Sequence, residues 1–285
     1  MQPLFTQSLK VETLNFTIDN LPPHLHGTTL VQLSDLHFDG ERLSEKILNQ
    51  AIEITNQAAA DFIVITGDFV TDDPQPIYEL VHHLKQLKAR SGIYGILGNH
   101  DLYRRDSQQI IIDALANIHI QILWNEIVYP VGSELALVGL ADFWSPAYKQ
   151  SSEVMDQLPA DLPRIVLAHN PDCAESLQKW RVDLQLSGHS HGGQIIIPGI
   201  VNISAFCAYL YRILPKKIKY RIPVLAACYR VMKHWEWVKG LHHIGKNRLY
   251  VNRGLGTYFP GRLFCPPEVT IITLNASDCD SPSPR

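Results

Sequence analysis

Five short apolar runs in this chain each end in Asp, Asn or His, and this feature constrains the fold more than any other. The runs lead into the following motifs: Asp35-Leu36-His37, Gly67-Asp68, Gly98-Asn99-His100-Asp101, His169-Asn170 and Gly188-His189-Ser190-His191. One such ending alone is typical of a turn with a capping residue. Five are hard to explain by packing, whereas ligands gathered at one end of a sheet explain them all. The sequence therefore predicts one shared metal site.

The residues between these motifs alternate between strand and helix patterns. The run from Asp61 to Thr66 is apolar throughout, as in a strand that is covered on both faces. Apolar residues at helical spacing predict a helix from Ser107 to Ala116. Alternating strands and helices predict an α/β fold with right-handed crossovers, and the pattern becomes richer in strands after Ile120.

Several further elements are predicted from local signals. Residues 11–18 are expected to form an edge strand, and residues 248–252 and 269–274 are expected to form returning strands. Asn170 as N-cap and Pro171 at the first helical position predict a helix that continues to about Trp180.

Composition indicates a soluble globular protein in a reducing compartment. Hydrophobic residues make up 46% of the 285 residues and charged residues 19%. The cysteines are unpatterned, which argues against a disulfide framework or a zinc ribbon: Cys173, Cys207, Cys228, Cys265 and Cys279. The first residues have no basic segment followed by an apolar one, so we expect no signal peptide and a cytoplasmic location.

The last third of the chain is basic although the net charge is −3. Between Asp183 and Glu268 the only acidic residue is Glu236, which suggests that this region faces an anionic partner. Residues 195–211 are uncharged but contain Pro198 and Gly199, and we expect them not to span a membrane. Helices are predicted at 205–214 and 223–237, on either side of a basic loop at 216–221. The polar tail, residues 275–285, is expected to be disordered.

Taken in order, the five motifs resemble those of the calcineurin-like metallophosphoesterases. The set runs from Ser34 to His191, and all five blocks are present. The resemblance implies a β-sandwich with helices on both outer faces, here as a single domain of residues 1–274. Residues 200–241 then form a basic and aromatic helical insertion, which is a candidate lid or membrane-contact element.

The resemblance also implies a dinuclear metal centre. One ion would take Asp35, His37 and His191, and the other would take Asn99, His169 and His189. Asp68 would bridge both ions. Carboxylate and imidazole ligands suit manganese, which we expect, and also iron or zinc. Two such cations lower the pKa of a bridging water and clamp a phosphate for in-line attack.

The chemistry assigns two further roles. His100 is expected to lie beside the leaving-group oxygen, as a general acid or as a stabiliser of developing charge, and Asp101 is expected to orient it through the other ring nitrogen. Candidates for substrate binding are Arg104, Arg105, Asn170 and Arg253.

Later motifs resemble one branch of the family, the bacterial membrane-associated phosphoesterases. They include Ser34-Asp35-Leu36-His37-Phe38, His169-Asn170-Pro171-Asp172, His189-Ser190-His191-Gly192-Gly193-Gln194 and Arg253-Gly254-Leu255-Gly256-Thr257. That branch includes the pyrophosphatase that cleaves UDP-2,3-diacylglucosamine in lipid A biosynthesis. The resemblance implies a metal-dependent phosphodiesterase or pyrophosphatase that acts on a lipid-linked nucleotide, peripherally on the inner face of the membrane.

Three alternatives remain open. The same core could act on a soluble phosphodiester, such as a cyclic nucleotide or nucleic acid. It could also be a silent scaffold that binds a membrane, although every predicted ligand is intact. Nucleic acid also fits a basic region, but the apolar residues there favour a lipid interface over nucleic acid. Those apolar residues could instead simply pack on the core.

Overall fold

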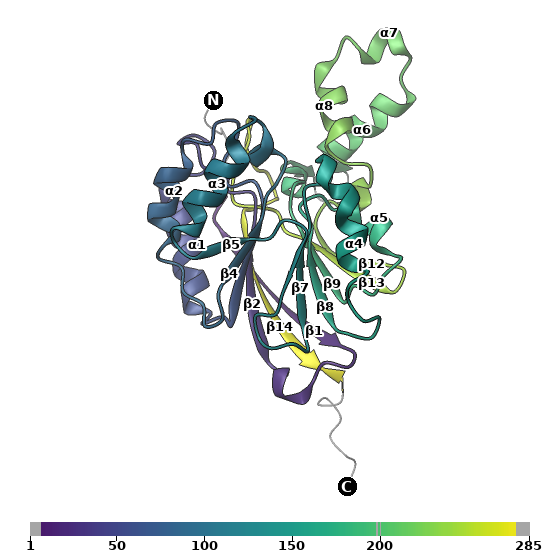
Figure 1. Ribbon diagram of the computed structural model, residues 1–285. Helices are drawn as coiled ribbons and strands as arrows, with labels where there is room; N and C mark the ends of the chain where they lie inside the picture. Colours follow the sequence, from purple (N-terminus) through teal and green to yellow (C-terminus); the bar gives the residue numbers. More distant parts are fainter. Residues whose placement is uncertain (1–6, 198, 200, 278–285) are drawn as a thin grey trace.

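Two six-stranded sheets form the body of the computed structural model, which describes residues 7–197, 199 and 201–277 (Figure 1). The first sheet has the order β1-β14-β2-β3-β4-β5. The bounds of its strands, in that order, are Lys10–Ile18, Glu268–Ala276, Thr28–Leu33, Phe62–Thr66, Ile93–Ile96 and Ile120–Ile122. The second sheet has the order β12-β13-β9-β8-β7-β6. Its strands span Gly240–Ile244, Asn247–Val251, Leu184–Ser187, Arg164–Leu167, Ala136–Gly139 and Glu126–Val128.

Helices cover the outer faces of both sheets, which confirms the predicted fold class. Figure 1 shows α1, α2 and α3 beside the first sheet, and α4 and α5 beside the second. These five helices span Glu45–Gln57, Ile77–Leu84, Ser107–Ala116, Ser151–Met155 and Cys173–Leu177. Short 3-10 turns complete the body at Pro23–Leu25, His100–Leu102, Pro146–Gln150, His191–Gly193 and Trp235–Trp237.

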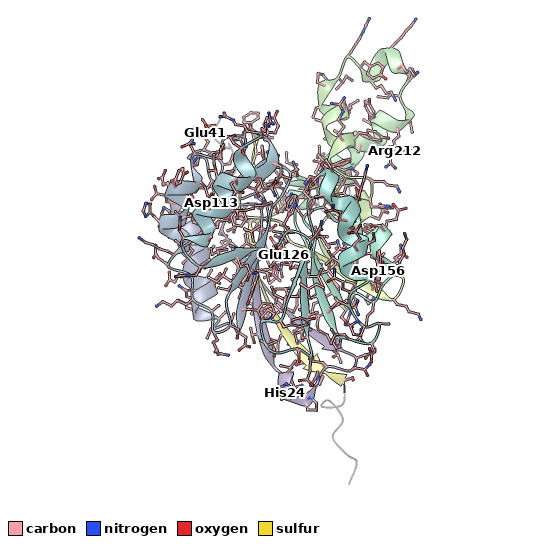
Figure 2. All side chains as sticks on the ribbon, in the orientation of Figure 1. His24, Glu41, Asp113, Glu126, Asp156 and Arg212 are labelled. Carbon is pink, nitrogen blue, oxygen red and sulfur yellow. The ribbon has the colours of Figure 1, made fainter. Side chains whose placement is uncertain are left out.

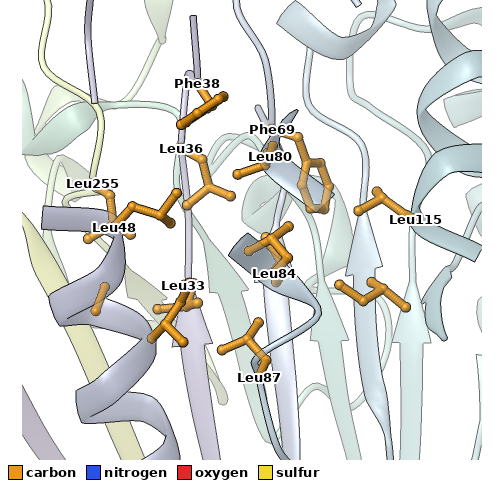
Figure 3. Packing of buried hydrophobic residues seen from close by; sticks show 14 of the residues in the cluster. Leu33, Leu36, Phe38, Leu48, Phe69, Leu80, Leu84, Leu87, Leu115 and Leu255 are labelled. Atoms are coloured by element: carbon orange, nitrogen blue, oxygen red, sulfur yellow. The ribbon is translucent and has the colours of Figure 1, made fainter. Parts of the chain in front are cut away.

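The alternation of side chains along the strands explains the layers. In β2, Val31 and Leu33 pack under the helices, whereas Leu30 packs between the sheets. Figure 3 shows Leu33, Leu48 and Leu84 meeting in the helix-covered core, and Figure 2 shows side chains filling the space between the sheets. Strands buried on both faces need apolar residues throughout, as the sequence indicated. This packing fixes the strand ends, and therefore the site, on a rigid frame.

A helical hairpin projects from the body beside the second sheet (Figure 1). It consists of α6, α7 and α8, which span Ile203–Ile213, Lys216–Lys219 and Pro223–Val231. A two-stranded ladder, β10 (Ile196–Ile197) with β11 (Val201–Asn202), precedes it. No helix within the described residues is long and apolar enough to cross a membrane.

Four predictions about element bounds need correction. The region predicted as a loop at 216–221 contains α7. The tail predicted to be disordered at 275–285 begins within β14, which includes residues 275 and 276. Residues 278–285 of that tail lie outside the described residues. α5 starts at Cys173 rather than after Asn170, because the Asn170 side chain accepts the N–H of Asp172 in a preceding turn. α8 ends at Val231, because the Asp172 carboxylate accepts two N–H groups from the chain that follows, those of Lys233 and His234.

Candidate metal centre

The predicted ligands follow strands that end at one edge of the two sheets. β2 leads to Asp35 and His37, and β3 leads to Asp68. β4 leads to Asn99, β8 to His169, and β9 to His189 and His191. Among these strands, β2, β3 and β4 are parallel to one another, and β8 is parallel to β9, so the carboxyl ends within each set lie at one edge of the sheet. The convergence of these side chains follows from the topology.

The side chains form two groups of potential metal ligands. Asp35, His37 and His191 offer atoms within 4.8 Å of one another, and so do Asp68, His169 and His189. One oxygen of Asp68, Oδ2, lies 3.3 Å from Nε2 of His37 and 3.2 Å from Nε2 of His169. Asp68 therefore lies between the two groups, as a bridging carboxylate must.

Each of the four histidines in these groups has an oxygen atom beside its outer nitrogen; for His37 this is the Tyr258 hydroxyl, 3.2 Å from Nδ1. The outer nitrogens of three of them lie beside carbonyl oxygens: His169 Nδ1 at 2.7 Å from Thr66, His189 Nε2 at 2.7 Å from Val231 and His191 Nδ1 at 3.2 Å from Gly256. A carbonyl only accepts, so each outer nitrogen carries the proton. In a neutral ring the inner nitrogen then presents a lone pair, as metal ligation requires.

The inner nitrogens face one another at short distance. Nε2 of His37 and Nε2 of His191 are 3.1 Å apart, and Nδ1 of His189 and Nε2 of His169 are 3.2 Å apart. Asn99 adds a buried Oδ1 that has no hydrogen-bond partner in the described part of the chain. An orphaned buried oxygen is costly unless something binds it. The donor set thus fits two divalent cations.

Electrostatics favour positive charge between the groups. Burial alone would raise the pKa of Asp68, but His169 and His37 hold it well below its usual range. Burial alone would lower the pKa of His169, but the charge of Asp68 raises it to about 10. Without metal, a proton on His169 therefore balances Asp68. A cation would take the place of that proton, so metal binding releases protons.

The backbone at this site is strained. The φ angles of Asp35, His37, Asp68, His189 and His191 lie between 43° and 68°, in the left-handed region. Non-glycine residues there cost roughly 1–3 kcal/mol each and persist where the surroundings hold them. Close packing does so here, because a Cβ on Gly98 would lie 2.2 Å from Asp68 Oδ1 and one on Gly188 would lie 2.1 Å from Asp35 Oδ2. The strained backbone costs folding free energy, and it directs these side chains toward the site.

His100 lies at the mouth of the same site. Its Nδ1 is 3.2 Å from the carbonyl oxygen of Thr71 and 3.4 Å from Asp72 Oδ1, and the residue lines the cavity at the ligand cluster. Asp101 does not orient it, which corrects the sequence-based prediction. The two carboxylate oxygens of Asp101 instead accept the N–H groups of Val70 and Gly98. Asp101 follows His100 in a 3-10 turn, so its side chain points back into the loop.

The predicted substrate-binding residues are not equivalent in the structure. Arg104 and Arg105 are exposed beside Asn99, and both line an adjoining cavity of about 480 Å³. Asn170 is fully buried, and its Nδ2 has no partner in the described regions. Arg253 is buried, and its guanidinium is paired with Glu12 at 2.7 Å and Glu268 at 2.6 Å, on β1 and β14, so its role in substrate binding stays a prediction.

Three residues that the sequence did not single out also surround the site. A cavity of about 520 Å³ at the ligand cluster is lined by Tyr258, Trp144 and Arg230, among others. Trp144 and Arg230 also line a second cavity of about 610 Å³ against the hairpin. Only Trp144 had a local signal in the sequence, because it follows closely on the apolar run that ends at Leu140; in the structure it is 59% exposed. Tyr258 and Arg230 reach the site only through the tertiary structure, so neither had a local signal in the sequence.

Comparisons with known proteins agree with this geometry. The profile of the calcineurin-like phosphoesterase family matches residues 28–193. Phosphodiesterase YaeI of Escherichia coli is 28% identical, over 92% of this chain and 86% of its own. UDP-2,3-diacylglucosamine pyrophosphatase LpxG of Chlamydia trachomatis is also 28% identical, over 93% of this chain and 88% of its own. In fold, the chain resembles the crystal structure of TT1561 of Thermus thermophilus, with a TM-score of 0.50, 11% identity and coverage of 80% and 90%.

Proposed function

Because the chain belongs to the calcineurin-like phosphoesterase family, we propose that it is a dinuclear metal-dependent phosphodiesterase or pyrophosphatase for a lipid-linked nucleotide. Membership makes it a hydrolase of phosphoester bonds. One observation carries the dinuclear proposal: two three-residue groups meet at Asp68, and their histidines present inner nitrogens to each other.

In this proposal the chain holds two cations, manganese first and iron or zinc as alternatives. Asp35, His37 and His191 would hold one, and Asn99, His169 and His189 would hold the other, with Asp68 shared. When bound, two such cations lower the pKa of a water molecule and neutralise charge on the phosphate. The protein excludes bulk water by burying Asp35, Asp68 and His169, each at most 1% exposed.

His100 would supply a proton to the leaving group. It is partly exposed, with 27% of its side chain accessible, and it lines the cavity at the ligand groups. The carbonyl of Thr71 holds the opposite nitrogen, so the ring keeps one orientation while Nε2 faces the substrate. Arg104, Arg105 and Arg230 lie around the mouth as cationic contacts for a second phosphate or a head group.

The substrate class rests on a relative and on the hairpin. LpxG is named for UDP-2,3-diacylglucosamine, and the same compound is the substrate we propose. The hairpin exposes apolar side chains beside its basic tip: Phe206, Tyr209, Ile213, Ile218, Tyr220, Ile222 and Val224. Apolar residues that pack on the core would not be exposed, so this surface supports contact with lipid rather than nucleic acid. We propose a peripheral position on the inner face of the membrane.

A hydrolysis panel with manganese tests the function. It compares bis(p-nitrophenyl) phosphate, a phosphomonoester, cyclic nucleotides and UDP-2,3-diacylglucosamine in detergent. We expect metal-dependent cleavage of the diester and the lipid-linked pyrophosphate, with the lipid-linked compound preferred. YaeI is named as a phosphodiesterase, so a phosphodiester is a substrate class to test, and a soluble one is our second candidate. Preference for a cyclic nucleotide would select it. No turnover of any compound with any of the three metals would overturn the proposal.

The membrane role leads to a prediction about the hairpin tip. Lys216, Lys217 and Arg221 are exposed, whereas Lys219 Nζ donates to the carbonyl of Tyr211 at 3.2 Å. Replacing all four by Gln should weaken binding to vesicles of phosphatidylserine and phosphatidylcholine by roughly 10²-fold. The reason is that each free cation near an anionic surface contributes about 1 kcal/mol. Flotation or sedimentation at low and high salt measures the change.

The control replaces four exposed lysines on the body by Gln: Lys46, Lys85, Lys88 and Lys149. It removes the same charge and should bind almost as the natural chain does. Equal weakening by both variants would mean that net charge, not the tip, attracts the surface. Trp235 and Trp237 lie half-buried in the 3-10 turn after the hairpin, so they belong to neither set.

A further inference from the structure

Tyr258 is the side chain that joins His100 to the ligand groups. Its hydroxyl lies 3.2 Å from Nδ1 of His37 and 3.4 Å from Nε2 of His100. The Tyr258 ring meets the His37 ring edge to face, with centroids 5.0 Å apart. The two histidine rings also meet edge to face, at 4.9 Å. One hydroxyl therefore contacts both a predicted metal ligand and the predicted acid.

The loop that carries Tyr258 is held firmly in place. The N–H of Tyr258 donates to Gln194 Oε1 at 2.7 Å, and the Arg42 guanidinium lies 4.6 Å from the ring centroid. Gly256 lets the loop approach, because a Cβ there would lie 2.9 Å from the backbone oxygens of Asp35 and Leu36. The position of the hydroxyl is thus set by the backbone and not by a mobile side chain.

Donors and acceptors along this contact have one consistent order. The carbonyl of Thr71 only accepts, so Nδ1 of His100 carries a proton, and Nε2 of the neutral ring accepts one. Nε2 of His37 faces Asp68, so its Nδ1 carries the proton. In the neutral ring the order is therefore His37 Nδ1–H to the Tyr258 oxygen, and Tyr258 O–H to His100 Nε2. When Nε2 carries the proton that a general acid transfers, the Tyr258 oxygen instead accepts from both histidine rings. The phenol fits both states, because its oxygen accepts and its O–H donates.

We propose that Tyr258 is a positioning residue, which fixes the ring of His100 at its reactive nitrogen and sets its orientation relative to the metal ligand His37. It takes the role that the sequence assigned to Asp101, whose carboxylate is occupied by backbone N–H groups. With Thr71 holding Nδ1 and Tyr258 holding Nε2, the ring is fixed from both sides. The inference rests on the proposed function, because His100 needs this position only as a proton donor.

The test is Tyr258→Phe, which keeps the ring and removes the hydroxyl. Substrates are bis(p-nitrophenyl) phosphate, whose leaving group needs no proton, and diphenyl phosphate, whose leaving group does. We expect kcat for diphenyl phosphate to fall about 10- to 100-fold, part of what a general acid contributes, with KM nearly unchanged. The fall for bis(p-nitrophenyl) phosphate should be less than about threefold. Tyr129→Phe, at an exposed tyrosine far along the chain, is the matched control.

A second readout does not depend on activity. Long-range proton–nitrogen NMR spectra of the histidine rings, recorded on the metal-free protein at pH 8, report which ring nitrogen carries the proton. In Tyr258→Phe the Nε2 resonance of His100 should move toward that of a nitrogen without a hydrogen bond, while thermal unfolding stays close to that of the natural chain.

The outcomes separate this inference from the proposed function. If the natural chain turns over no phosphodiester, the proposed function fails, and the NMR experiment still decides the contact. Equal loss on both diesters would mean that Tyr258 acts through the metal ligand His37, which would overturn the proposal. An unchanged His100 resonance in Tyr258→Phe would overturn it as well.

Discussion

Asp68→Ala is expected to remove the bound metal and to reduce turnover by more than about 10³-fold. The cations supply several kcal/mol of stabilisation to the transition state, and about 4 kcal/mol corresponds to that loss. Asp68 Oδ2 faces both His37 and His169, so its removal leaves both groups incomplete at once. Its other oxygen accepts the N–H of His100 at 2.9 Å, so the loop that carries Asn99 loses a contact as well.

Metal content by mass spectrometry after dialysis, together with phosphodiesterase turnover, measures this effect. The natural chain should retain two ions and the variant fewer than one. Asp113→Ala is the control, because Asp113 is exposed on α3, where it accepts a hydrogen bond from Gln109 (Figure 2). A variant that keeps two ions would refute the bridging role, even if its turnover falls.

The strand pattern allowed the core of the fold to be predicted. Apolar runs of four to six residues ended at polar motifs, and the structure has strands at those runs: β2, β3, β4, β8 and β9. Parallel pairing then brings their carboxyl ends together, so side chains from residue 35 to residue 191 meet. Periodicity and strand length are local properties, which is why one sequence was enough for this step.

The orientation of individual side chains was not predictable in the same way. Asp101 and Arg253 both carry charges of the expected kind. In the structure, however, the Asp101 carboxylate accepts two backbone N–H groups, and the Arg253 guanidinium is paired with two glutamates. Their partners lie on segments distant in sequence, such as β1 and β14 for Arg253. The left-handed backbone at the ligands also had no sequence signal, because Asp and His rarely adopt it without tertiary support.

In the hairpin, too, the helices were predictable from local spacing, whereas the tertiary contacts were not. Two helices around a basic segment were predicted from apolar spacing, and α6 and α8 lie there. The end of α8 was predicted six residues too late, since Val231 is its last residue and Trp237 was the expected one. The carbonyl of Val231 is the partner of His189 Nε2, so the point where the helix stops also orients a predicted metal ligand. Contact between the hairpin and the ligand loop is a tertiary feature that spacing alone does not encode.

His100→Ala should separate chemistry from metal binding. We expect turnover of a diester with a poor leaving group to fall by roughly 10²–10⁴-fold, the usual contribution of a general acid, while metal content stays near two ions. The structure gives the reason, since His100 belongs to neither ligand group: its ring contacts Thr71, Asp72 and Tyr258 and only packs against the ring of His37. Adding imidazole should restore part of the turnover, because it can occupy the space that the ring leaves in the cavity.

The measurement combines kcat for diphenyl phosphate, metal content and the response to imidazole. His82→Ala is the matched control, because His82 is exposed on α2, and it should change none of the three. Metal loss in His100→Ala would make His100 a ligand and reverse the assignment. Normal turnover with normal metal content would instead leave Tyr258 without a catalytic partner, so the positioning role proposed above would fall together with that of the acid.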